Sequence, residues 1–245
     1  MTATTGATAE EIVARLAAIV GAKYVITDVQ AAEPYLKEPR GLFVGATPAV
    51  VEPKTTAEVS AILAYANENG LKIVPQGGNT GLVGGQIPID GSEIVLSLRR
   101  MDAIREIDPT SDTMTVEAGV TLLRCQEAAE GVDRLFPLSL AAEGSCTIGG
   151  NISTNAGGTQ VIAYGNTRAL VLGVEVVLAD GRVLNSLGKL RKDNTGYDLR
   201  QLFIGSEGTL GIVTAAVLEM VPRPRSFATS MVAVENPAAA VALLE

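Results

Sequence analysis

The chain has 245 residues, 47% of them hydrophobic, a formal net charge of −8 and no histidine. This length fills one large or two small domains, and the composition predicts a soluble globular protein. An acidic chain without a basic stripe argues against a nucleic-acid partner, and the lack of histidine excludes catalytic triads and zinc sites built on imidazole.

The same inventory bears on location and redox state. No apolar run reaches membrane-spanning length, and the first residues, Met1–Thr5, lack the charged and apolar regions of a secretory signal. We therefore expect a cytoplasmic location. The two cysteines, Cys125 and Cys146, suit a reducing compartment, and we expect them to be packing or site-lining thiols.

The first seventy residues contain two helix signatures. Thr8–Glu11 is a capping box, and apolar residues then recur on one helical face until Gly21, which predicts an opening helix. Residues 25–45 contain two prolines and predict a strand fragment with a connecting loop. A strand at Ala49–Glu52 precedes a second capping box, Thr55–Glu58, and an apolar stripe of helical spacing.

A glycine-rich loop follows the next strand. The apolar run Leu71–Val74 completes a β–α–β unit that delivers the chain to Pro75–Gln86, which holds five glycines. The loop lacks the Gly-x-Gly-x-x-Gly and Lys-Ser/Thr patterns of dinucleotide-binding and P-loop folds, and Ile87–Ile89 stands where their helix begins. Its amides are predicted to form a nest for the anionic oxygens of a phosphate-rich ligand; a flexible surface loop is the alternative.

The middle of the chain alternates strands with one more helix. Ile94–Leu98 is predicted as a strand, and Ile104–Ile107 and Thr113–Val116 as a hairpin. A helix is predicted over residues 122–130, with Thr121 as its cap.

An irregular stretch, residues 138–158, comes next and is rich in small residues. Such a stretch is uncommon inside a compact domain unless it binds something. The apolar run Val171–Leu178, a turn and Val183–Leu184 predict a second hairpin. Residues 202–220 lead into a last strand and carry Glu207 between glycines, as either a capping carboxylate or a ligand contact.

The last residues indicate a further domain. Pro222–Arg225 is a stiff, charged linker, and Pro237 opens a helix predicted over residues 238–244. This pattern has no stop signal before Glu245. Because domains rarely end within an amphipathic helix, we expect a second domain to follow in the natural protein.

Three stretches together resemble one family. Pro75–Gly85, Gly149–Gly158, and Arg191–Leu199 running into Phe203–Thr214 are similar to the motifs of the FAD-linked oxidase family, whose flavin domain is of the vanillyl-alcohol-oxidase type. The resemblance covers about residues 40–225. It is strongest to the branch that oxidises D-2-hydroxyglutarate, D-lactate and glycolate.

The resemblance implies an α+β fold, namely a two-subdomain FAD-binding domain of the vanillyl-alcohol-oxidase type with the start of a truncated substrate (cap) domain. Residues 1–45 would form an N-terminal helix and connecting segment. Residues 46–222 would form the FAD-binding domain, with subdomains at about 46–105 and 106–222. Residues 223–245 would form a linker and the first helix of the substrate domain.

The resemblance also implies where FAD lies. Gln76–Gly81 would wrap the pyrophosphate, residues 144–155 would line the diphosphate, ribityl chain and isoalloxazine, and residues 205–212 would close over the adenosine. The cofactor-binding residues implied in this way are Pro75, Gln76, Gly77, Gly78, Asn79, Thr80, Gly81, Leu82, Gln86, Gly144, Ser145, Cys146, Ile148, Gly149, Gly150, Asn151, Thr154, Asn155, Gly158, Gly205, Glu207, Gly208, Gly211 and Ile212.

In the family, flavin N5 accepts a hydride from a D-2-hydroxy acid, and the general base and divalent-metal ligands lie in the substrate domain. We therefore expect no catalytic or metal residue in this chain, and no enzymatic turnover by the chain alone. FAD is expected to bind noncovalently, because a histidyl link is impossible, with a cysteinyl link through Cys146 as the alternative.

The resemblance implies two kinds of partner: a small 2-hydroxy acid, and an electron acceptor such as a quinone, a cytochrome or an electron-transfer flavoprotein. A homodimer is left open. Two other functions also stay open: a sugar or alcohol oxidase on the same fold, and a flavin-binding module that works only with a partner.

Overall fold

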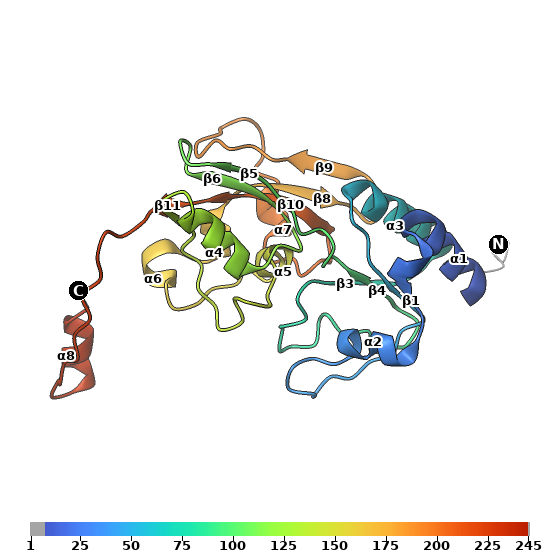
Figure 1. The fold of residues 1–245 in the computed structure, drawn as a ribbon, viewed down its shortest axis with the longest axis horizontal. Helices are drawn as coiled ribbons and strands as arrows, with labels where there is room; N and C mark the ends of the chain where they lie inside the picture. The colour runs from blue at the N-terminus through green and yellow to red at the C-terminus, as the bar shows by residue number, and fades with distance from the viewer. Residues whose placement is uncertain (1–7, 245) are drawn as a thin grey trace.

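Two β-sheets organise residues 8–244, the part of the chain that the computed structural model describes (Figure 1). The first sheet has the strand order β1-β2-β4-β3 and the second β5-β6-β10-β8-β9, while β7 and β11 form a separate pair. The expected N-terminal segment 1–45 and C-terminal segment 223–245 include residues 1–7 and 245, which lie outside the described residues.

The first sheet contains the predicted β–α–β unit. Both β2 and β3 run parallel to β4, so the unit crosses over one intervening strand. Helices α1 (Ala9–Val20) and α3 (Thr56–Asn69) share a core with this sheet, in which Leu16 and Ile62 are fully buried. The strands are β1 (Val25–Ile26), β2 (Val50–Val51), β3 (Ile73–Gln76) and β4 (Ile94–Ser97).

Both predicted N-terminal helices are confirmed, but their caps differ. At α1 the Thr8 side chain accepts the Glu11 N–H at 3.2 Å and Glu11 Oε2 accepts the Thr8 N–H at 2.7 Å, which is a complete capping box. At α3, Thr55 Oγ1 accepts the Glu58 N–H at 3.1 Å. The Glu58 carboxylate instead accepts the Lys54 N–H at 2.6 Å, so the second box is only half formed.

The predicted connecting loop over residues 25–45 is partly wrong, because helix α2 (Val29–Leu36) lies within it. Asp28 caps the start of α2, and Pro34 sits inside the helix rather than ending it. The Tyr35 hydroxyl donates to Glu52 Oε1 at 2.8 Å, next to β2. Packing on the first sheet therefore outweighs the helix-breaking tendency of the proline.

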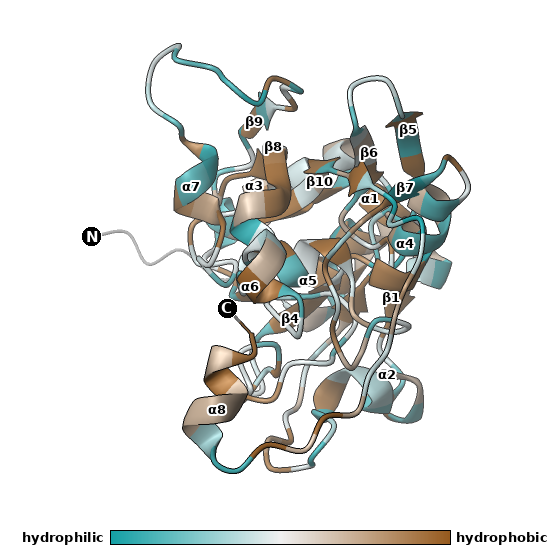
Figure 2. Ribbon diagram, turned by 90° about the vertical axis from the view of Figure 1, so that its left-hand side faces the viewer, coloured by the Kyte–Doolittle hydropathy of each residue, from teal (hydrophilic) through white to brown (hydrophobic). Residues whose placement is uncertain are grey.

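The second sheet is antiparallel and confirms both predicted hairpins. Its central strands β8 and β10 are hydrophobic and almost wholly buried. The edge strand β5 combines charged residues with Ile104 and Ile107 and carries both colours in Figure 2. The five strands are β5 (Ile104–Asp108), β6 (Thr113–Glu117), β8 (Val171–Val177), β9 (Val183–Ser186) and β10 (Ile212–Glu219).

Several helices cover the second sheet or connect its strands. Helix α4 (Leu122–Glu130) follows its N-cap Thr121, as predicted. Helix α5 (Ile148–Ser153) was not predicted; it lies within the irregular stretch 138–158 and packs against β10. The remaining elements are η1 (Ala22–Tyr24), β7 (Arg134–Leu135), α6 (Val161–Tyr164), η2 (Thr167–Leu170), α7 (Arg200–Phe203), β11 (Val221–Pro222) and α8 (Pro237–Ala242).

A buried carboxylate joins the two sheets. Glu175 of β8 accepts hydrogen bonds from Thr56 of α3 at 2.7 Å, from Thr214 of β10 at 2.9 Å and from Arg105 of β5 at 3.3 Å. Burial alone raises the pKa of Glu175, but these donors outweigh it and hold the pKa below its usual value. Helix α3 of the first sheet is thereby fixed to the second.

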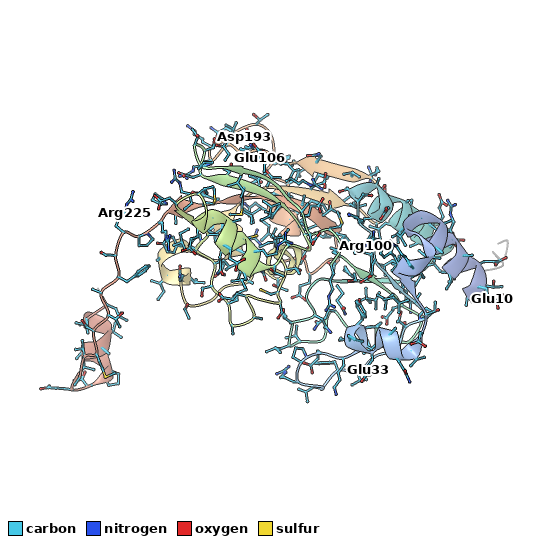
Figure 3. All side chains as sticks on the ribbon, in the orientation of Figure 1. Glu10, Glu33, Arg100, Glu106, Asp193 and Arg225 are labelled. Carbon is cyan, nitrogen blue, oxygen red and sulfur yellow. The ribbon has the colours of Figure 1, made fainter. Side chains whose placement is uncertain are left out.

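Two surface segments extend from this body. The loop after β9 is tied to the sheet edge by Lys189 Nζ, 2.5 Å from Glu106 Oε1, and Figure 3 shows Glu106 and Asp193 at that edge. The segment after β11, which includes Arg225, leads away from the sheets towards α8 (Figures 1 and 3). Helix α8 confirms the last predicted helix. Within residues 8–244, no helix is both long and apolar enough to cross a membrane.

Candidate functional site

A cavity of about 590 Å³ lies between the glycine-rich loop 75–86, helix α5 and the turn before β10. The three motifs singled out in the sequence thus contribute to one site. Most of the predicted residues line it, namely Pro75, Gln76, Gly77, Gly78, Asn79, Thr80, Gly81, Leu82, Gln86, Cys146, Gly149, Gly150, Asn151, Thr154, Glu207, Gly208 and Ile212.

The glycine-rich loop packs directly on the segment that leads into α5. A Cβ added at Gly78 would overlap the carbonyl oxygen of Ser145, and one added at Gly77 would overlap Thr147 Oγ1. The Ser145 carbonyl belongs to the backbone, so it cannot move aside unless the whole segment before α5 moves. The positive-φ positions of the loop are instead Asn79 and Gly84, with φ of 55° and 82°. Gly77 and Gly78 therefore allow two binding segments to approach each other.

The loop presents free main-chain donors. Residues 77–86 lie outside the helices and strands, and within the described chain none of their N–H groups donates to a main-chain carbonyl. Main-chain donors are obligatory hydrogen-bonding groups, so these remain available to water or to a ligand. Successive N–H groups of this kind form a concave site for anionic oxygens.

Buried side chains around the cavity also lack partners. Gln76, only 1% exposed, donates through Nε2 to the carbonyls of Tyr35 and Gln86, each at 2.9 Å, which leaves Oε1 unpaired. Asn151, 4% exposed, has an unpaired Nδ2, and Thr147 has an unpaired Oγ1. An unsatisfied buried polar group costs about 1–3 kcal/mol. The cavity therefore suits a ligand that supplies both donors and acceptors.

Residues 38–43, for which the sequence predicted no role in the site, support the outside of the glycine-rich loop. The buried Glu38 carboxylate accepts the N–H groups of Arg40 at 2.7 Å and Leu42 at 2.6 Å. Burial raises the pKa of Glu38, but these bonds outweigh that effect and lower it. Arg40 Nη2 then donates to the Leu82 carbonyl, and the Phe43 ring lies where a side chain at Gly84 would stand. The shape of the loop thus depends on residues far from it in sequence.

Glu207 approaches the cavity from the opposite side. Its N–H donates to the Ser153 carbonyl at 2.8 Å, its backbone is left-handed with φ of 52°, and Oε2 lies 3.5 Å from the position of a Cβ at Gly85. The residue is exposed, and within the described chain its carboxylate has no hydrogen-bond partner or ion pair. A ligand contact agrees with this placement better than a structural cap does.

Some predicted residues do not line the cavity. Asn155 Oδ1 accepts the Arg168 N–H at 2.9 Å, and Ser145 contributes the carbonyl that touches Gly78. Gly144 has open space beside it. The predicted residues outside the lining are Gly144, Ser145, Ile148, Asn155, Gly158, Gly205 and Gly211.

Other lining residues were missed. Pro39 and Leu98 reach the cavity only through tertiary packing, and no local pattern marks them. Residues 140–142 belong to the irregular stretch whose composition already indicated binding. Val83, Gly85, Thr147 and Ser153 lie within the predicted binding segments but were not named singly. The other missed residues are Pro39, Leu98, Leu140, Ala141, Ala142, Ala156 and Val213.

Comparison with solved structures identifies the fold. The chain superposes on alkyldihydroxyacetonephosphate synthase with a TM-score of 0.79 at 21% identity, over 92% of this chain and 43% of the other. It superposes on p-cresol methylhydroxylase with a TM-score of 0.75 at 24% identity, over 89% of this chain and 44% of the other. The fold is the α+β FAD-binding fold of the vanillyl-alcohol-oxidase type, as predicted.

The FAD binding domain family matches residues 47–186, and the chain belongs to this family. D-2-hydroxyglutarate dehydrogenase, mitochondrial, of Danio rerio is 53% identical over 182 residues, which are 74% of this chain and 34% of the relative. The Bos taurus protein of the same name is 48% identical over 204 residues, 82% of this chain and 37% of the relative. The chain thus spans about a third of the length of these relatives.

These comparisons confirm the resemblance that the motifs implied and overturn one expectation. The relatives from fish, cattle and rice carry mitochondrial in their names. The predicted cytoplasmic location is therefore wrong. It rested on the absence of a secretory signal, which does not bear on delivery to an organelle by other routes.

Proposed function

We propose that this chain is the FAD-binding part of a flavin-dependent dehydrogenase that oxidises a D-2-hydroxy acid, of the D-2-hydroxyglutarate or D-lactate type, to the 2-oxo acid. The proposal rests on one observation: the cavity is lined by the loop of residues 77–86, whose N–H groups donate to no main-chain carbonyl in the described chain. Relatives named for this activity, at 44–55% identity, support the choice of substrate class.

The chain's own residues bind and orient the cofactor. The amides of residues 77–81, within the loop Gln76–Gly81 expected to wrap the pyrophosphate, would hold the diphosphate. Gln76 Oε1 would accept from a hydroxyl, and Asn151 Nδ2 would donate to an acceptor on the ligand. Such fixed donors suit an extended dinucleotide because they need no rearrangement when it binds. Bound flavin supplies the hydride acceptor of the reaction.

FAD is held noncovalently. The sequence has no histidine for a histidyl link. Cys146 lines the cavity, but burial raises the pKa of its thiol, so little of the nucleophilic thiolate forms.

Residues 46–222 act as the FAD-binding unit, with subdomains at about 46–105 and 106–222, and residues 223–245 lead into the substrate domain. The general base and the divalent-metal site belong to that domain. The partners are the 2-hydroxy acid and an electron acceptor, for which a quinone, a cytochrome and an electron-transfer flavoprotein are the classes to test. The relative from Saccharomyces cerevisiae is named D-2-hydroxyglutarate–pyruvate transhydrogenase, so pyruvate belongs in the same test.

The test is a titration of the purified chain with FAD, followed by anaerobic mixing with D-2-hydroxyglutarate and with D-lactate. We expect a yellow complex that absorbs at about 450 nm, and no flavin bleaching within seconds, because positioning and general-base groups are each worth orders of magnitude in rate. Failure to bind FAD would refute the proposal. Oxidation of sugars or alcohols with O₂ by a longer form of the protein would favour an oxidase instead.

A further inference from the structure

The turn over residues 204–208 has an unfavourable backbone. Gly205, Glu207 and Gly208 have φ of 83°, 52° and 79°, and the value at Glu207 is uncommon for a residue with a side chain. The same turn supplies Glu207 and Gly208 to the cavity. A backbone of this kind persists only where surrounding contacts hold it.

One side of the turn is fixed to helix α5. The Gly205 N–H donates to the Ile152 carbonyl at 3.0 Å, and the Glu207 N–H donates to the Ser153 carbonyl at 2.8 Å. Both acceptors lie in the last turn of α5, where carbonyls have no partner within the helix. These bonds set the distance between the turn and α5. The residues just before Gly205 are held by the buried side chains of Phe203 and Ile204 and by the Ile204 N–H, which donates to the Arg200 carbonyl at 3.2 Å.

The other side is fixed by Arg168. Its Nη1 donates to the Gln201 carbonyl at 2.9 Å and to Gln201 Oε1 at 2.6 Å, and its Nη2 donates to the carbonyl of Ile204. The main chain of Arg168 is itself held, because its N–H donates to Asn155 Oδ1 at 2.9 Å. A planar guanidinium can serve these acceptors together, whereas a lysine ammonium cannot match the geometry.

We propose that Arg168 is a positioning residue of the flavin site: it holds the 204–208 turn so that Glu207 and Gly208 close the cavity. The inference rests on the proposed function. Arg168 does not itself line the cavity, so it acts on the cofactor only through the turn.

The test uses Arg168→Ala, Arg168→Lys and a control, Arg182→Ala, whose side chain is 77% exposed and pairs with Asp180. Loss of the charge-assisted bonds is expected to weaken FAD binding by about 10- to 100-fold in Arg168→Ala. Millimolar guanidinium should restore much of the affinity in this variant and leave the parent unchanged, with sodium chloride at equal ionic strength as the reference. Arg168→Lys should not recover it.

Amide hydrogen exchange of the FAD-free proteins gives an independent readout. Exchange at Gly205 and Glu207 should accelerate in Arg168→Ala, while the Met220 amide, which donates to the Asp112 carbonyl at 2.7 Å, should be unchanged. Parent-like FAD affinity or parent-like exchange at the turn would overturn the role of Arg168. Weakened binding without guanidinium rescue, together with accelerated exchange throughout, would also overturn it by indicating general destabilisation. If the parent fails to bind FAD, the proposed function fails, and the exchange result still decides whether Arg168 holds the turn.

Discussion

Gly150 offers a way to fill the cavity without disturbing the fold. It lies in α5 and lines the cavity, and, apart from the chain neighbours and the backbone of its own helix, the nearest atom to an added Cβ among residues 8–244 is Thr147 Oγ1 at 3.7 Å. Alanine is favoured over glycine in a helix by about 0.8–1 kcal/mol, which corresponds to about 2–4 °C in Tm for a chain of this size. We expect the FAD-free Gly150→Ala variant to melt at or above the parent temperature.

The methyl group of Gly150→Ala would occupy part of the cavity that the ligand is expected to fill. Overpacking a well-filled site costs about 1–3 kcal/mol, so FAD should bind about 5- to 150-fold more weakly. The assay is a fluorescence titration with FAD, beside thermal melting of the FAD-free proteins. Parent-like affinity in a folded variant would refute the placement of FAD in this cavity.

Two neighbouring glycines provide matched controls. A Cβ at Gly149 would stand 2.7 Å from Ala118 Cβ, so Gly149→Ala should lower Tm by forcing α5 away from the end of β6. Gly144 does not line the cavity, and in the described part of the chain an added Cβ would have no atom within 4 Å beyond its chain neighbours. Gly144→Ala should therefore change neither Tm nor affinity, although the motif resemblance places Gly144 among the cofactor-binding residues.

Three further substitutions test other parts of the structure. Gly78→Ala should lower both Tm and FAD retention, because the added Cβ meets the Ser145 carbonyl; a parent-like melting curve would contradict the loop contact. Glu207→Ala should weaken FAD about tenfold with an unchanged melting temperature, since its carboxylate has no partner within the described chain; a lower Tm without FAD would show a structural role instead. Glu175→Gln should lower the free energy of unfolding at pH 7 by about 1.5–3 kcal/mol. The pKa of Glu175 is lowered by folding, so its contribution is present above the unfolded value of about 4.3 and is lost as pH falls through the folded value. Denaturant unfolding at pH 7 and pH 3 should therefore show a smaller difference between parent and variant at pH 3.

The elements that depend on local chemistry were predictable. The capping box at Thr8, the hairpin turn between β8 and β9 and the helix start at Thr121 each follow from a few neighbouring residues. Helix α2 was missed because Pro34 is a strong local signal against a helix, and its burial against the first sheet is a tertiary effect. Strand order was beyond reach for the same reason, since the insertion of β4 between β2 and β3 leaves no local trace.

For the site, the sequence indicated which segments contribute, but not whether a given residue lines the cavity or packs against another segment. Gly78 and Gly150 look alike in sequence, yet Gly78 allows one loop to touch another and Gly150 leaves open space in the cavity. Asn155 belongs to a binding motif, but its side chain holds Arg168. The composition of a segment shows that it is rich in small or polar residues. The direction in which each of these residues faces depends on packing against segments that are distant in sequence.

The left-handed residues of the site show why this distinction matters. Asn79, Asn155 and Glu207 all have positive φ, and only the asparagines belong to a residue type that adopts it readily. Asn79 is held by donating Nδ2 to the carbonyls of Pro34 at 3.0 Å and Lys37 at 2.9 Å, and Glu207 is held by its N–H bond to Ser153. At Asn79 a contact from another segment reinforces a backbone that asparagine adopts readily, whereas at Glu207 such a contact maintains a backbone that the residue type does not favour. The cavity is therefore a product of tertiary assembly, and substitutions far from the ligand, such as those at Arg168, should alter binding as directly as substitutions at the lining.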